Sequence, residues 1–184
     1  ELRTLIESYM TGSTVGDTGY VLYDNDELLA KLIEYGVGKI MELAEVYVSK
    51  AFSKLRVKNS VKINTGISIK GNLLDVSWDV EGMKNEEVME VLESYKKQKK
   101  YHRLRNGELL NIYESGMDVL ALMMEDMNLS KTQLKEGMAE IPVYRALYLD
   151  TVMRENANII QAQRDASFCS LIKDFEEIKN RQYD

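Results

Sequence analysis

Residues 96–107 form the stretch whose residue types and spacing most clearly suggest a chemical role. Six cationic side chains and the single histidine fall within ten residues there, and the stretch ends on an Asn-Gly pair. The cations and an interleaved tyrosine are Lys96, Lys97, Lys99, Lys100, Tyr101, Arg103 and Arg105. Lysine and arginine contact phosphates without reading base sequence, and a tyrosine ring can pack on a sugar or a base. This basic run therefore predicts a nucleic-acid contact.

The basic run also has a purely structural explanation. A helix that ends near Lys96 favours cations in its last turn, because the helix dipole leaves negative charge there. The whole chain carries a net charge of −6, and its basic middle, residues 46–110, lies between acidic flanks. Attraction to nucleic acid would therefore be local, and it would be screened beyond about 10 Å at ~0.1 M salt. Composition by itself favours a solvated helix end over a phosphate contact.

Other residues that could do chemistry have ordinary explanations. Asp75 and Asp79 lie on one face of a predicted strand and could hold magnesium for phosphodiester cleavage. Such carboxylates are also typical of the solvated face of a half-buried sheet. His102 and Cys169 are the single histidine and the single cysteine, so a zinc site built from them would be short of ligands. We expect a buried thiol at Cys169, and we predict neither a catalytic residue nor a metal ligand.

The elements that position these residues follow from hydrophobic periodicity. Apolar and polar residues alternate between residues 61 and 80, and Gly71-Asn72 lies in the middle of this stretch. A two-residue turn there predicts a hairpin with all its apolar side chains on one face. The expected pairs are Ile69 with Leu74, Ile67 with Val76, Thr65 with Trp78, and Ile63 with Val80. Val46, Val48, Leu55 and Val57 would supply one or two further strands of an antiparallel meander.

Helical periodicity surrounds this sheet. A helix is expected after Asp24-Asn25, and another from Asn85 to the basic run. The turn Asn106-Gly107 predicts a second hairpin, with Leu104 opposite Leu109. The remainder is expected to be helical, over residues 119–127, 130–137, 144–160 and 168–178. The sequence thus predicts an α+β fold: residues 1–82 form an N-terminal helix and an antiparallel meander, and residues 83–184 form a helix, a β-hairpin and a mainly helical half.

Several stretches resemble the helicase-associated region of bacterial Swi/Snf-type ATPases. The resemblance rests on residues 99–107 (KKYHRLRNG), 109–112 (LLNI), 141–150 (IPVYRALYLD), 164–168 (RDASF) and 171–175 (LIKDF), and more loosely on residues 45–49 and 73–80. It covers residues 20–184. In that family the region lies just before a two-lobed motor that hydrolyses ATP and translocates on duplex DNA.

The resemblance implies an accessory role. The phosphate-binding Gly-Lys-Thr of the motor is absent from the sequence, so no catalytic residue of the family is carried over. The expected partners are the motor lobes of the same polypeptide and double-stranded DNA. ATP and magnesium would belong to the parent helicase-like hydrolase, and no cofactor is expected in this part of it.

Three functions stay open at this point. The chain could be a non-catalytic module that assists duplex DNA binding or regulates the motor. It could be a docking or autoinhibitory module without nucleic-acid contact, or a metal-dependent nuclease that uses Asp75 and Asp79. No apolar stretch approaches the ~18 residues needed to span a bilayer, so no membrane partner is expected. One cysteine and no signal-peptide pattern favour a cytoplasmic protein. Because the chain begins at Glu1, we expect it to be a piece of a longer polypeptide.

Overall fold

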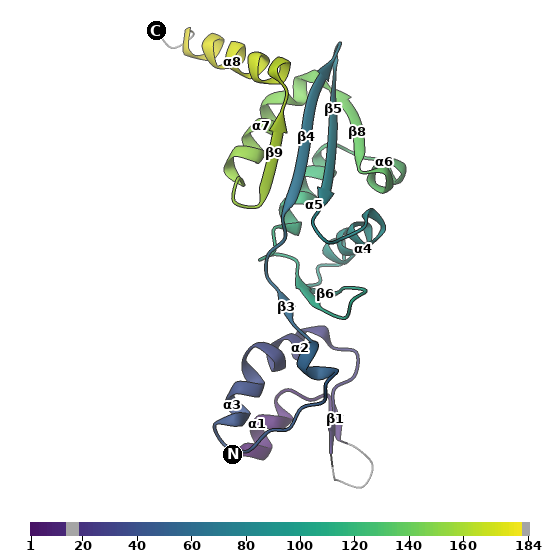
Figure 1. Ribbon diagram of the computed structural model, residues 1–184, viewed down its shortest axis with the longest axis vertical. Helices are drawn as coiled ribbons and strands as arrows, with labels where there is room; N and C mark the ends of the chain where they lie inside the picture. The colour runs from purple at the N-terminus through teal and green to yellow at the C-terminus, as the bar shows by residue number, and fades with distance from the viewer. Residues whose placement is uncertain (14–18, 182–184) are drawn as a thin grey trace.

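The computed structural model describes residues 1–13 and 19–181. It is elongated, with a small N-terminal lobe joined by a narrow neck to a larger body (Figure 1). The predicted α+β fold class is confirmed. The N-terminal lobe comprises the described residues before 45. The neck comprises residues 45–58 with the strands β6 (Tyr101–Arg103) and β7 (Leu109–Asn111), and the body comprises the other described residues.

Short helices and a small hairpin build the N-terminal lobe. Asn25 caps a helical segment as expected, since its Oδ1 accepts a hydrogen bond from Leu28 N at 2.9 Å. The segment does not end at Gly36 but continues as helix beyond it. The elements are α1 (Leu2–Glu7), β1 (Gly12–Ser13), β2 (Tyr20–Val21), α2 (Asp26–Lys31), the π-helical turn η1 (Leu32–Gly36) and α3 (Val37–Met41).

The larger sheet of the body has the strand order β8-β5-β4-β9. Its strands are β4 (Ile63–Lys70), β5 (Leu73–Val80), β8 (Met138–Pro142) and β9 (Ile160–Arg164). Strands β4 and β5 form the predicted hairpin, and the predicted register, with Ile63 opposite Val80, is confirmed. Strand β8 pairs antiparallel with β5, whereas β9 pairs parallel with β4.

Strands β8 and β9 were not predicted, and a helix was expected over residues 144–160. A 3₁₀ turn, η3 (Val143–Arg145), leads into helix α7 (Ala146–Glu155), which ends at Asn156. The carbonyl of Asn156 accepts hydrogen bonds from Ile159 N and Ile160 N at 2.9 and 2.8 Å, which turns the chain into β9. Each of the two strands has five residues, too few for a clear period. They form because the β4–β5 hairpin offers edges that need backbone partners.

The core of the body lies between this sheet and the helices on one of its faces (Figure 1). Trp78 and Val76 of β5 belong to the same buried cluster as Leu120 and Met123 of α5. The helices are α4 (Asn85–Lys96), α5 (Met117–Asp126), α6 (Lys131–Glu136) and α7. Ser130 caps α6 within a reciprocal capping box.

Helix α8 (Ala166–Arg181) begins beside the sheet and extends away from the body (Figure 1). Asp165 caps it, since its Oδ1 accepts a hydrogen bond from Phe168 N at 2.7 Å. Phe168 is fully buried and anchors the first turn. The expectation of a buried thiol at Cys169 is wrong, because Cys169 is exposed. One helical step turns its side chain by about 100° from that of Phe168.

The neck contains a smaller sheet, ordered β3-β7-β6. Strand β3 (Val57–Lys58) runs parallel to β7, and the 3₁₀ turn η2 (Phe52–Lys54) precedes it. The strand expected at Val46 and Val48 does not form, and that segment is irregular. Strand β3 therefore joins the second hairpin and not the larger sheet.

The β6–β7 hairpin forms as predicted, but its register differs by one residue. Arg103, and not Leu104, lies opposite Leu109. A two-residue Asn-Gly turn needs positive φ at both residues, whereas φ is positive at Gly107 (90°) and not at Asn106. The chain instead closes a three-residue loop, which shifts the pairing by one position.

The two sequence units, residues 1–82 and 83–184, contribute to one core. Strands β4 and β5 come from the first unit, and β8 and β9 come from the second. Within the described part of the chain, no helix is both long and apolar enough to cross a membrane.

Candidate nucleic-acid interface

The basic run spans the last turn of α4, a tight turn and strand β6. The turn forms because Gln98 adopts a positive φ of 57°, which lets Lys99 N donate to Ser94 O at 3.0 Å. This is the hydrogen-bonding pattern of a left-handed helix C-cap, a position more often filled by glycine or asparagine. The run therefore ends a helix, as predicted, and then enters the neck.

Both arginines of the basic run are paired with carboxylates. Arg103 Nη2 lies 2.7 Å from Asp26 Oδ1, and Arg105 Nη2 lies 2.6 Å from Glu90 Oε1. The hydrogen bond from Arg105 holds the pKa of Glu90 below its usual value. A phosphate would have to compete with these carboxylates for the two guanidinium groups.

Tyr101 is a core residue of the neck. It is 5% exposed and clusters with Ala30 of α2 and Leu109 of β7. Its ring is therefore not presented for stacking on a base. The ammonium of Lys100 lies 5.3 Å from the ring centroid. Tyr101 raises the pKa of Lys100 most, and Glu114 and Glu27 add to that rise because their charges lie nearby.

The other lysines of the run lie at and just after the end of α4. Lys96 lines a cavity between α4, α5 and α6. Lys97 and Lys99 are exposed at the end of α4. Neither forms an ion pair with a residue that the structure describes. Of the seven predicted residues, the structure thus buries Tyr101, pairs both arginines with carboxylates and leaves the four lysines exposed.

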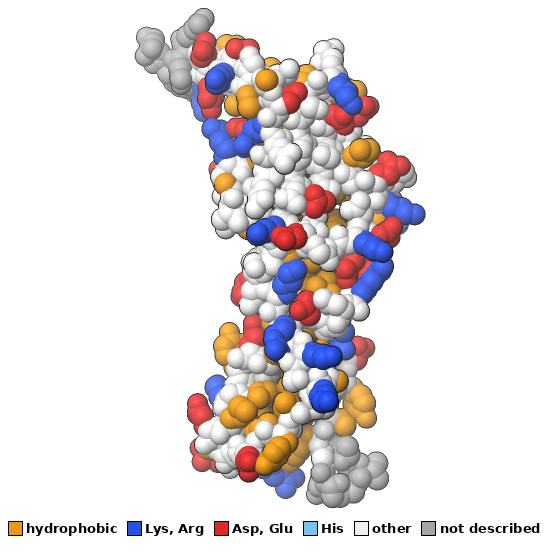
Figure 2. Space-filling model, in the orientation of Figure 1, with side chains coloured by type: hydrophobic (Ala, Val, Ile, Leu, Met, Phe, Trp, Pro, Cys, Tyr) orange, Lys and Arg blue, Asp and Glu red, His pale blue; other side chains and the backbone are white. Residues whose placement is uncertain are grey.

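A second group of cations lies on the neck and was not singled out from the sequence. We define the neck strip as Lys50, Lys54, Arg56 and Lys58, which surround η2 and β3. Lys and Arg side chains gather along this part of the neck in Figure 2. None of the four forms an ion pair with a described residue. The sequence does carry a signal for the strip, because residues 46–74 contain no acidic residue.

The side chain of Arg56 is held in place on the neck strip by the backbone of the residues that precede it. Its Nη1 donates to the carbonyl oxygens of Ser53 and Leu55, each at 2.7 Å. The rest of the guanidinium keeps its donors for an external acceptor, since an arginine side chain carries five N–H groups. The neck strip therefore presents four positive charges, and the guanidinium of Arg56 is oriented by two hydrogen bonds.

The two carboxylates considered for metal binding have separate partners. Asp75 forms an ion pair with Lys70, and the hydrogen bond between them raises the pKa of Lys70. Asp79 Oδ2 accepts a hydrogen bond from Asn64 Nδ2 at 3.0 Å. Among the described residues, no group of three or more His, Cys, Asp or Glu side chains is arranged to hold a metal ion.

The fold and surface define an α+β domain whose clearest chemical feature is a basic strip on a narrow neck, with three of its four cations exposed and Lys58 half-buried. A comparison with protein-family models matches residues 1–184 to the family described as bacterial SNF2 helicase associated. The chain therefore belongs to this family, as the resemblance implied, and the match extends over the whole chain. No curated protein and no solved structure matches it.

Proposed function

We propose that this chain is a non-catalytic accessory domain of an SNF2-type helicase and that its neck strip contacts the phosphates of duplex DNA. The observation that carries the proposal is the strip itself, four cations without carboxylate partners among the described residues, in an acid-free segment. The motor lobes of the same polypeptide would be its partners. Those lobes, and not this domain, would bind ATP and magnesium.

The contact would be electrostatic and independent of base sequence. Each cation that neutralises a phosphate releases a counterion, so the logarithm of the affinity falls with the logarithm of salt concentration by about 0.9 per contact. Four contacts from the strip predict a slope of roughly −3 to −4. Lys97 and Lys99 would add to this slope. Arg103 and Arg105 would add less, because each already pairs with a carboxylate.

A variant with four substitutions tests the neck strip. We expect the variant with Lys50→Ala, Lys54→Ala, Arg56→Ala and Lys58→Ala to bind a short labelled duplex at least about tenfold more weakly at low salt. Its salt slope should also flatten by roughly three. Fluorescence anisotropy between about 50 and 200 mM salt measures both quantities.

The matched control removes the same charge elsewhere. The control variant replaces four exposed lysines that lie on α6 and α8 or just before α4. Its substitutions are Lys84→Ala, Lys135→Ala, Lys173→Ala and Lys179→Ala. This variant should keep the wild-type slope. An equal loss in both variants would mean that net charge alone acts, and binding of the strip variant at wild-type strength would refute the DNA contact.

A second function, docking on the motor without DNA contact, has its own support. The N-terminal lobe and the start of the neck expose large apolar side chains, including Tyr47 (85% exposed), Tyr23 (71%) and Tyr35 (61%). Figure 2 shows hydrophobic side chains gathered on this end of the molecule. Exposed apolar patches often mark protein interaction sites. If docking is the function, deleting the domain from the helicase should change its ATPase rate and leave its DNA affinity unchanged.

A further inference from the structure

A groove between α4, α5 and α6 lies on the body. Its central cavity has a volume of about 450 Å³. The apolar side chains that line the cavity are Met89, Leu92, Ala121, Met124, Leu129 and Leu134. Two of these are methionines, whose flexible side chains adapt to different partners and are frequent at binding surfaces. The lining therefore suits an apolar side chain from outside.

Two neighbouring hollows share lining residues with the cavity. The first hollow shares Lys96 and Glu125 with the cavity and also contains Tyr95. The second shares Met89 and Lys131 with it. Three hollows with common walls make an open-ended groove. Such a groove accommodates a length of polypeptide better than a compact small molecule.

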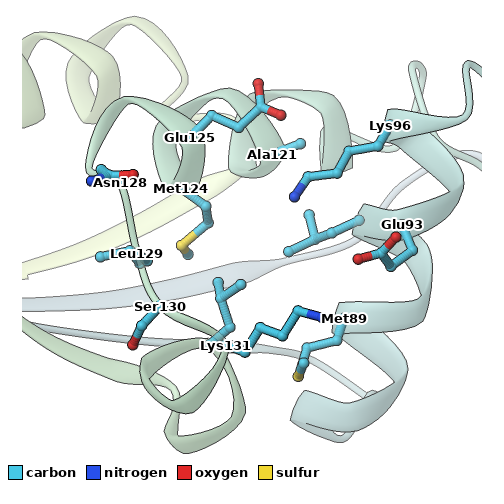
Figure 3. A pocket seen from close by; sticks show the side chains of 12 residues that line it. Met89, Glu93, Lys96, Ala121, Met124, Glu125, Asn128, Leu129, Ser130 and Lys131 are labelled. Carbon is cyan, nitrogen blue, oxygen red and sulfur yellow. The ribbon is translucent and has the colours of Figure 1, made fainter.

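Two ammonium groups point into the cavity. Figure 3 shows Lys96 entering from α4 and Lys131 from the start of α6, on opposite sides of the apolar lining. Neither lysine forms an ion pair with any residue that the structure describes. Both can therefore receive a carboxylate from a partner.

The carboxylates around the groove are placed differently. The carboxylate of Glu125 points away from the cavity in Figure 3, whereas Glu93 stands on the α4 wall beside Lys96. Glu86 and Glu136 line only the second hollow. The central cavity is thus lined by two lysines, two glutamates and apolar side chains, and of the two glutamates Glu125 turns its carboxylate away (Figure 3).

We propose that this groove binds an acidic amphipathic segment of a partner protein, with an apolar anchor between two carboxylates. The anchor would insert between Met89 and Met124, and the carboxylates would accept charge-assisted hydrogen bonds from Lys96 and Lys131. This inference does not rest on the proposed DNA contact, because the groove and the neck strip share no residue.

Methyl NMR tests the proposal at the groove itself. Methyl groups of Met89 and Met124 are observed in protein labelled with [¹³C]methyl-methionine. The probe is a short synthetic peptide with leucines flanked by glutamates, and the comparison peptide replaces each glutamate by lysine. We expect saturable shifts of both methyl signals with the glutamate peptide alone. Shifts of equal size with the lysine peptide would overturn the proposal.

Substitutions in the groove separate charge from packing. The variant with Lys96→Ala and Lys131→Ala should bind the glutamate peptide at least about tenfold more weakly. Glu93→Gln should strengthen binding of the glutamate peptide. The control pair Lys84→Ala and Lys173→Ala removes equal charge outside the groove and should have no effect. Unchanged binding of the peptide by the groove variant would refute the proposal. Methyl shifts that depend on protein concentration without peptide would also refute it, because the occupant of the groove would then be a second copy of the chain.

Discussion

Asp150 shows how a single buried carboxylate joins three elements. Its side chain is 5% exposed, and Arg164 of β9 and Arg154 of α7 lie 3.1 and 2.9 Å from its two oxygens. Arg154 also reaches Glu176 of α8 at 3.2 Å. Two guanidinium groups compensate a charge that burial would otherwise make costly. Asp150 and Arg164 lie in stretches that carry the family resemblance. Those stretches therefore supply ion pairs that connect α7, β9 and α8.

His102 gives a prediction about pH. Its Nδ1 lies 2.8 Å from Ser94 Oγ. Burial lowers the pKa of His102, and the charges of Glu90, Glu87 and Asp26 only partly oppose this. The unfolded chain, with a histidine pKa of about 6.5, therefore binds the proton before the folded chain does as pH falls. Stability linked to His102 is present above that value and is lost as pH falls toward the folded pKa.

The measurement compares unfolding curves at several pH values. From about pH 7 to pH 5, the free energy of unfolding of the wild type should fall more than that of His102→Gln, in urea titrations. The carboxylates titrate in both proteins, so the difference isolates the histidine. Parallel pH dependences would contradict a lowered pKa.

At the scale of elements, the β6–β7 hairpin holds the N-terminal lobe. Tyr101 and Leu109 from the hairpin form a small buried cluster with Ala30 from α2. Leu29, Ile33 and Val57 pack against this cluster. The Arg103–Asp26 ion pair lies at the same contact between hairpin and α2. The lobe therefore depends on one small apolar contact, separate from the main core.

Tyr101→Ala should loosen this contact selectively. Removing a buried aromatic ring costs about 3 kcal/mol, because both transfer energy and packing are lost. Hydrogen exchange in α2 should accelerate, while exchange in the β4–β5 hairpin should not change. Tyr144→Ala removes the same ring at a position that is 72% exposed and serves as the control. Equal acceleration in α2 and in β4–β5 would show that the two clusters unfold together.

The elements that could be predicted are those with local signals. The β4–β5 hairpin has strict alternation and a central turn, and α6 has both Ser130 and Gly137 at its ends. The β6–β7 register was missed because Asn-Gly permits two loop lengths, and the choice between them depends on φ at Asn106. Strands β8 and β9 were missed because they owe their existence to the neighbouring hairpin.

At the scale of the whole molecule, the larger sheet makes residues 1–82 and 83–184 interdependent. Fragment 83–184 alone would leave β8 and β9 without β5 and β4. We expect it to be largely unfolded by circular dichroism and by amide NMR dispersion. Adding fragment 1–82 should restore the native spectrum.

A different truncation should be tolerated. Among the described residues, none before Val61 belongs to the main core cluster. Fragment 46–184, which lacks the N-terminal lobe, should therefore keep a cooperative unfolding transition. A folded 83–184 fragment, or an unfolded 46–184 fragment, would contradict this view of the core.

The sequence by itself determined the fold class, the first hairpin with its register, the caps at Asn25 and Ser130 and the family, because these depend on residues that are close along the chain. Tertiary structure alone decided which cations remain available. The Arg103–Asp26 pair joins residues 77 positions apart. Tyr101, in the neck, is buried against helix α2 of the N-terminal lobe. Pairing and burial over such distances leave no local pattern. The basic run was therefore visible in the sequence. The sequence did not show that its arginines form ion pairs, that Tyr101 joins a small core and that Lys96 lines a groove.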